Sequence, residues 1–139
     1  MPLSYQDPLT ALVLSSCDFV DSLNRQPLRV KGLAAGKYSL RIDGESLGTF
    51  SAEQLSSGIN LAELNTPMAR QAANVHSLTM QHNAIHATRW RQVQVPLQKT
   101  QSSELLEALR ALDELEVRLV RDQRAAAQPQ THRFSLSPE

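Results

Sequence analysis

Residues 103–120 read SELLEALRALDELEVRLV, and this stretch decides the fold. Its leucines recur at intervals of three and four residues, which places them along one side of an α-helix. They are Leu105, Leu109, Leu112, Leu115 and Leu119. Ser103 followed by Glu104 is typical of a helix start, because an acidic side chain is favoured near the positive end of the helix dipole. The pattern predicts one amphipathic helix from Ser103 to about Ala127.

A second long helix is predicted before this one. Thr66 is a favourable N-cap, and Pro67 suits the first helical position, where its missing N–H has no partner to lose. The helical pattern continues to Gln92, and Pro96 then breaks it. Two long helices joined by a short break predict an antiparallel helical hairpin. Alanines and amides interrupt the apolar stripe of the first helix, which indicates that part of its partner surface is polar or missing.

The segment before the hairpin has the pattern of β-structure. Arg25–Leu33 and Tyr38–Ile42 alternate apolar and polar residues, as half-buried strands do. Asp43-Gly44 is a strong turn signal, and Leu47–Phe50 reads as a third strand. The three strands are predicted to form an antiparallel meander, with one apolar face that needs a cover.

Shorter elements complete the expected fold. Ser51-Ala52-Glu53-Gln54 has the form of a capping box, and Gly58 would end that helix. Residues 10–16 could form a strand but are too few to exclude a helical turn, and residues 132–137 could form an edge strand. We therefore expect an α+β fold: a small antiparallel β-meander, a long antiparallel helical hairpin and a C-terminal edge strand. Residues 1–62 would hold the meander and its short helix, and residues 63–139 the hairpin and last strand, as one structural unit.

Length and composition exclude several classes of function. The 139 residues suffice for one modest core and are too few for most complete α/β hydrolases. Basic and acidic residues number 14 each and aromatic residues make up 4%, so no nucleic-acid partner is indicated. The single cysteine, Cys17, excludes an internal disulfide. No apolar run is long enough to span a membrane, and no signal-peptide pattern occurs, so we expect no membrane partner and a cytoplasmic location for the sequence as written.

Two glycine-containing motifs resemble catalytic or phosphate-binding loops. Gly44-Glu45-Ser46-Leu47-Gly48 matches the nucleophile-elbow pattern, which needs a strand before the serine and a helix directly after it. A strand is predicted after Ser46, and no histidine lies within the sheet to act as a base, so a hairpin turn is the better interpretation. An esterase that uses Ser46 is the least favoured alternative. Gly32-Leu33-Ala34-Ala35-Gly36-Lys37 is one residue short of the Walker spacing and lacks its Ser or Thr, which indicates a turn.

Histidines on the first long helix are the candidates for a metal site. His82 and His86 are four residues apart and share a helix face, as zinc-binding pairs do. Asn83 stands where the zincin motif has glutamate, and no acid or cysteine lies nearby on that helix. We expect surface or partly packed histidines there and no metal.

Two other side chains are interpreted as structural. Cys17 has no activating neighbour and is predicted to be a small buried residue. Trp90 stands between two arginines and is predicted to pack on the hairpin rather than to stack on a ligand.

Six runs of residues form an ordered set along the chain. They are Asn24–Val30, Gly36–Gly44, Gly58–Ala62, Thr66–Ala69, His86–Val93 and Gln123–Pro129. Together they resemble the C-terminal region of bacterial SGNH/GDSL-type hydrolases, which are esterases and acylhydrolases, over roughly residues 20–138. Such enzymes use a Gly-Asp-Ser-like nucleophile block and a late Asp-x-x-His block, and neither occurs in this chain. The resemblance therefore implies no catalytic residue here.

What the resemblance implies is an accessory domain that packs on an SGNH-type catalytic domain or mediates its assembly, with no cofactor and no metal. The alternative is a free-standing module whose helices self-associate, with a homodimer as the simplest closed form. The interface is then expected on the second long helix, at Leu105, Leu109, Leu112 and Leu119.

Overall fold

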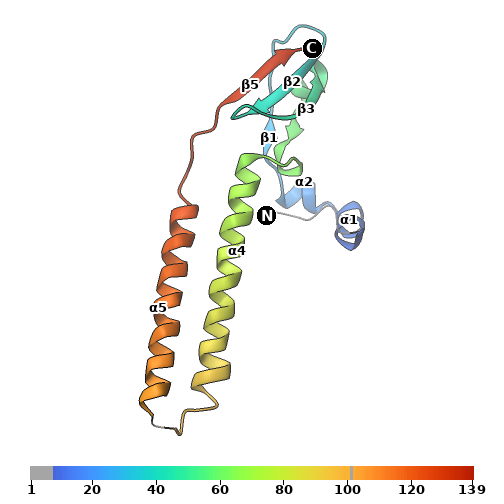
Figure 1. Cartoon of the computed structure of the whole chain (residues 1–139). Helices are drawn as coiled ribbons and strands as arrows, with labels where there is room; N and C mark the ends of the chain where they lie inside the picture. The colour runs from blue at the N-terminus through green and yellow to red at the C-terminus, as the bar shows by residue number, and fades with distance from the viewer. Residues whose placement is uncertain (1–7, 101) are drawn as a thin grey trace. The chain divides into compact units, whose positions relative to one another are not determined.

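A computed structural model describes residues 8–100 and 102–139 and confirms the α+β class. The chain divides into two compact units. The first comprises the described residues up to Ala72 together with Gln130–Glu139, and the second comprises Ala73–Pro129. The first unit holds the β-sheets and the second holds most of the helical hairpin (Figure 1).

The larger sheet of the first unit has three antiparallel strands in the order β3-β2-β5 (Figure 1). They are β2 (Lys37–Ile42), β3 (Glu45–Ser51) and β5 (Phe134–Pro138). Asp43 and Gly44 form the β2–β3 turn with positive φ angles of 54° and 85°, as a tight hairpin requires. The predicted hairpin and the predicted C-terminal edge strand are both confirmed. The last strand, grouped above with the helical hairpin, pairs with β2 of the first unit.

The predicted three-stranded meander is wrong in its first strand. Only β1 (Pro27–Leu28) forms in the segment 25–33, and it pairs with β4 (Ile59–Asn60) in a separate two-stranded sheet. The side-chain oxygen of Asn60 accepts a hydrogen bond from the backbone N–H of Gln26 at 2.9 Å, which anchors β1 to this partner. Gly32, with a φ of 80°, bends the following loop out of an extended strand conformation.

Helices complete the first unit. α1 (Pro8–Ser15) and α2 (Phe19–Leu23) precede β1, so the strand expected at residues 10–16 is wrong and its helical alternative is right. α3 (Ala52–Ser57) has the predicted capping box with Ser51 and ends at Gly58, and the 3₁₀-helix η1 (Leu61–Glu63) follows β4. The core consists of side chains that are at most 3% exposed, from β2, α3 and η1. They are Leu40, Ile42, Leu55 and Leu61.

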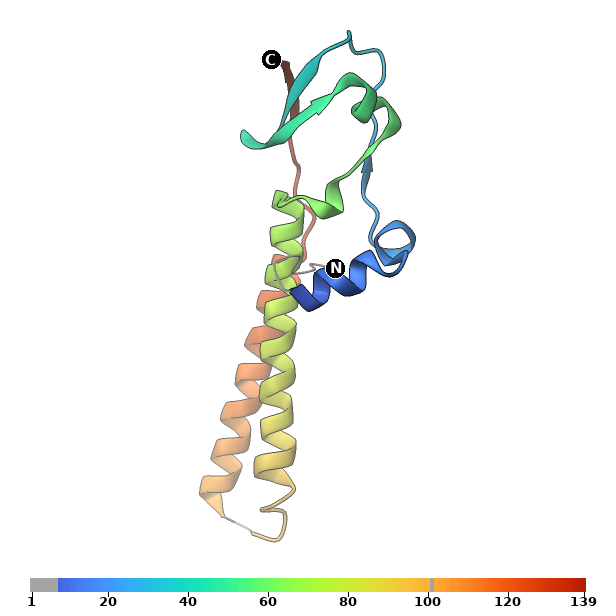
Figure 2. The ribbon, with the colours of Figure 1, turned by 90° about the vertical axis from the view of Figure 1, so that its right-hand side faces the viewer.

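The helical hairpin confirms the predicted long helices. α4 (Pro67–Ala87) begins with the backbone N–H of Ala69 donating to Thr66 Oγ1 at 3.0 Å, and it continues through a π-helical stretch, η2 (Thr88–Gln94). α5 (Ser103–Ala126) runs antiparallel beside it (Figures 1 and 2). The N-cap of α5 is Ser102 rather than Ser103, because the Leu105 N–H donates to Ser102 Oγ at 3.1 Å. The structure describes every residue of α4, η2 and α5, and none of them is buried.

Within the described part of the chain, no helix combines the length and the apolar character that a membrane crossing needs.

Candidate functional site

The two histidines considered as metal ligands, His82 and His86, lie at the contact between the two helices of the hairpin. Glu116 of α5 lies against both histidines of α4, with its Oε2 3.3 Å from His86 Nδ1 and 3.9 Å from His82 Nε2. The Glu116 side chain is only 17% exposed, and its Oε1 has no hydrogen-bond partner among the described residues. Sequence reasoning looked for an acid on the same helix, whereas the acid comes from α5, 30 residues further along.

The two histidines of this cluster lie against each other and share one carboxylate. The rings of His82 and His86 stack nearly parallel, with centroids 6.2 Å apart and 16° between their planes. One carboxylate oxygen already faces both rings. Among the residues that the structure describes, no group of three or more His, Cys, Asp and Glu side chains is arranged to hold a metal ion. The cluster therefore acts as a polar contact that fixes one helix against the other.

Two further polar contacts join the two sides of the hairpin, one on each side of Glu116 along α5. Arg89 Nε and Nη2 donate to the two carboxylate oxygens of Asp113, and the hydrogen bond from Arg89 lowers the pKa of the Asp113 carboxyl. Gln123 Nε2 donates to Thr79 Oγ1 at 2.5 Å. We call these contacts, with the one at Glu116, the polar seam. The hairpin is thus held by polar side chains along much of its length.

The predicted interface leucines lie on the same helix as the acids of the seam. Leu105, Leu109, Leu112 and Leu119 are each half-buried, and so is Leu115 of the same stripe. Two helices alone leave such a stripe partly in water, because each helix can cover only one side of its partner. The four candidate interface residues therefore lie on one helix, α5, and none of them is fully buried.

Ser46 has none of the surroundings of a nucleophile. It is exposed in β3, opposite Arg41 of β2, and the strand continues to Ser51 before a helix begins. The hairpin-turn interpretation is confirmed, since the turn itself is Asp43-Gly44.

His132, the first residue of the expected edge strand 132–137, lies beside the β2–β3 turn, so a histidine does contact the sheet. His132 Nδ1 lies 2.7 Å from Asp43 Oδ2, and the Arg133 N–H donates to Asp43 Oδ1 at 2.8 Å. These hydrogen bonds, that of His132 first, lower the pKa of Asp43. The pair closes the contact between the β2–β3 turn and the start of β5, and its partners lie 89 residues apart. No local pattern could have indicated it.

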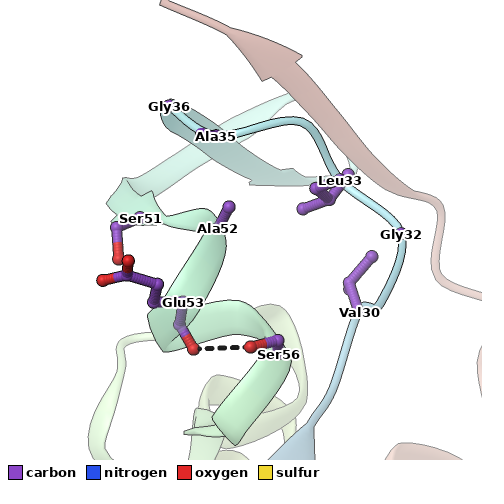
Figure 3. A pocket seen from close by; sticks show the side chains of 9 residues that line it. All are labelled: Val30, Gly32, Leu33, Ala35, Gly36, Ser51, Ala52, Glu53 and Ser56. Atoms are coloured by element: carbon purple, nitrogen blue, oxygen red, sulfur yellow. Dashed lines mark hydrogen bonds between the residues drawn. The ribbon is translucent and has the colours of Figure 1, made fainter.

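The glycine loop 32–37 is not a phosphate site. Gly32, Leu33, Ala35 and Gly36 line a shallow hollow of about 360 Å³ with Val30 and the first turns of α3 (Figure 3). Glu53 is the one charged side chain among the lining residues, and a carboxylate disfavours an anion. Ser56 Oγ is turned to the backbone, donating to the Glu53 carbonyl at 2.9 Å.

The two side chains interpreted as structural, Cys17 and Trp90, are both exposed. Cys17 is exposed after α1, with Sγ 3.1 Å from the Val13 carbonyl, so its predicted burial is wrong. Cys17 lies between α1 and α2. Trp90 is 51% exposed, and the Arg91 guanidinium carbon lies 5.8 Å from its ring centroid.

Comparisons with known proteins support the fold. No protein-family model matches the chain, and no curated protein matches it. Among solved structures it is similar to BT4096, a gut microbial diltiazem-metabolizing enzyme, with a TM-score of 0.71 and 22% sequence identity. The match covers 94% of this chain and 37% of that enzyme, so the chain spans little more than a third of the enzyme's length. At this identity the similarity shows a shared fold.

Proposed function

We propose that the chain is a non-catalytic accessory domain that packs on a catalytic domain of the SGNH/GDSL hydrolase type. One observation carries the proposal: nearly the whole chain matches only 37% of an enzyme, which leaves the larger part of that enzyme for other tasks. The absence of Gly-Asp-Ser and Asp-x-x-His blocks from the sequence supports a non-catalytic role. The exposed setting of Ser46 supports it further.

The first experiment tests catalytic silence. The purified chain is incubated with short-chain nitrophenyl esters, beside the variants Ser46→Ala and Ser135→Ala, the latter a second exposed serine of the same sheet. We expect no turnover above buffer for any of the three proteins. Turnover that Ser46→Ala abolishes and Ser135→Ala retains would identify a serine esterase and overturn the proposal.

The second experiment tests the packing. A hydrolase domain that carries Gly-Asp-Ser and Asp-x-x-His blocks and is encoded beside this chain is titrated with it in a calorimeter. We expect a stoichiometric complex with a negative heat-capacity change, because apolar surface becomes buried. A mixture that sediments as two separate proteins contradicts the accessory role.

Self-association of the hairpin is a second candidate role, and the half-buried leucines of α5 favour it. It does not depend on a catalytic partner.

A further inference from the structure

Exposed apolar side chains lie along one side of α5, away from its half-buried leucines. Leu106 stands seven residues, or nearly two turns, before Asp113, and Val117 stands four residues after it, so the three share one side of the helix. Asp113 bonds Arg89 of η2, and this side of α5 therefore borders η2. Leu106 is 58% exposed and Val117 is 69% exposed. Nothing in the described part of the hairpin covers these two side chains.

The same side of the hairpin continues onto η2. In an antiparallel helix pair, equal rotations past the helix–helix contact lead to the same side of the pair. A rotation of about 80° leads from Glu116 to Leu106, and a rotation of at most about 80° leads from His82 to Trp90. Val95 follows one π-helical turn after Trp90, because its N–H donates to the Trp90 carbonyl at 2.9 Å. Trp90 is 51% exposed and Val95 is 43% exposed.

We call this the apolar side of the hairpin. Its members are Trp90, Val95, Leu106 and Val117.

The charge around the apolar side is positive on α4 and η2. No aspartate or glutamate occurs between Glu63 and Glu104, so this arm of the hairpin and the turn after it carry basic charge only. Arg91 lies directly at the apolar side, with its guanidinium carbon 5.8 Å from the centroid of the Trp90 ring. An anionic surface would therefore meet no like charge on this arm.

The charges of α5 on this side are positive as well. Arg110 stands four residues after Leu106 and Arg124 seven residues after Val117, and both arginines are exposed. Asp113 is the one acid on this side among the described residues of α5, and Arg89 pairs with it. The other exposed acids of the first half of the helix are turned at least about 60° away from Leu106 and Val117. They are Glu104, Glu107 and Glu114.

We propose that the apolar side of the hairpin binds an anionic phospholipid surface. A bilayer surface offers apolar chains directly beneath negative charge, which this mixture of exposed apolar side chains and arginines requires. The indole of Trp90 suits the boundary, because its ring is apolar and its N–H can stay among the headgroups. Arg91 and Arg110 can bind lipid phosphates with both guanidinium nitrogens. Such a contact needs no spanning segment, so the prediction of no membrane partner, which rested on spans and leaders, does not exclude it.

Vesicle binding of the full chain provides the test, because Trp90 is the single tryptophan and lies at the proposed contact. Vesicles of phosphatidylglycerol and phosphatidylcholine are compared with vesicles of phosphatidylcholine alone. We expect the chain to sediment with the anionic vesicles and the Trp90 emission to shift to shorter wavelength as the indole leaves water. Binding to the neutral vesicles should be at least about tenfold weaker, and added salt should weaken binding to the anionic ones.

Two paired variants locate the contact. Leu106→Glu with Val117→Glu places acids on the apolar side, and Arg91→Gln with Arg110→Gln removes two of its cations. Each pair should weaken binding to anionic vesicles about tenfold or more, since roughly 1 kcal/mol is associated with each basic residue at such a surface. Circular dichroism verifies that the helices of each variant are intact, and the arginine pair changes no apolar side chain.

The matched control carries Ala108→Glu and Ala111→Glu, two exposed positions of α5 that are turned about 120° or more from Leu106 and Val117. It adds the same charge as the first variant and should bind anionic vesicles much more tightly than that variant does. A natural chain that does not bind anionic vesicles overturns the inference. Equal losses in the control and in both variants also overturn it, as does an apolar side that only a hydrolase domain covers.

Discussion

The two units of the chain exclude water to very different degrees. In the first, Leu40 and Ile42 of β2 are completely buried, and Leu55 and Leu61 join them from separate elements. The second unit comprises most of α4 together with η2 and α5, none of whose residues is buried. Hydrogen bonds between polar side chains join the two sides of this hairpin. Burial of apolar area is the main source of stability, so the first unit gains more stability from its buried side chains than the hairpin does. The hairpin would therefore gain more stability than the first unit if another protein surface covered its apolar side chains.

The largest effect should come from the core of the sheet unit. Ile42→Ala removes a fully buried side chain from the central strand and should lower the free energy of unfolding by about 2–5 kcal/mol. Ile42→Val, the matched control, should cost about 0.5–1.5 kcal/mol. Urea unfolding gives both values, and hydrogen exchange of the β2 amides assigns them to this unit. Equal costs for the two variants would show that the site is not a close-packed core.

The next largest effect concerns the turn that sets the register of this sheet. Gly44 has a φ of 85°, and an alanine there adopts a left-handed conformation at a cost of about 1–2 kcal/mol. The space around Gly44 is open, so any loss measures backbone strain rather than a clash. Ser46→Ala, two residues away on the exposed face, should stay within about 0.5 kcal/mol. A Gly44→Ala variant as stable as the natural chain would mean that the turn rearranges freely.

A smaller effect is expected in the hairpin. Leu112→Ala removes a half-buried side chain and should cost about 1 kcal/mol in dilute solution, less than a buried leucine costs. Trp90, the single tryptophan, lies in η2 and reports hairpin unfolding by its fluorescence. If two copies of the chain pair through the leucines of α5, the cost rises with protein concentration. A cost of 3 kcal/mol or more at any dilution would place Leu112 in a complete core and remove the contrast between the units.

Features set by neighbouring residues were predictable from the sequence. The Asp43-Gly44 turn, the capping box at Ser51 and the start of α4 at Pro67 each depend on a few adjacent residues, and all three are confirmed. The leucine spacing likewise predicted α5. The predicted first residue of that helix, Ser103, is confirmed, and its N-cap is Ser102.

Pairings between distant segments were not predictable. Alternation indicated a strand near Pro27, but alternation does not name the partner, which proved to be β4 rather than β2. The contacts of Glu116 with two histidines and of Asp43 with His132 join residues that are 30 or more positions apart. Only the tertiary fold brings these side chains together. The sequence could therefore indicate individual residues of the candidate site, such as the two histidines, but not the contacts that they make.

The smallest effect is the response to acid, which both units should show. The pKa of Asp43 is lowered in the first unit by hydrogen bonds from His132 and the Arg133 N–H, and that of Asp113 in the second by Arg89. A carboxyl group whose pKa is lower in the folded state stabilises the fold above its unfolded pKa, near the ordinary value of 3.8. This stabilisation is lost as pH falls through the folded pKa, because the unfolded chain then binds the proton more readily.

Asp43→Asn and Asp113→Asn separate these two contributions. Each variant should melt at a lower temperature than the natural chain at pH 7. The difference should shrink as the pH falls below about 4, because protons then bind the unfolded carboxyl groups more readily than the folded ones. Trp90 fluorescence should detect the change for Asp113→Asn, whereas hydrogen exchange of the β2 amides should detect it for Asp43→Asn. Glu114→Gln, an exposed acid next to Asp113 on α5, is the control and should leave the pH profile unchanged. Melting profiles that run parallel to that of the natural chain from pH 7 to pH 3 would show that the contacts of neither carboxyl group stabilise its unit.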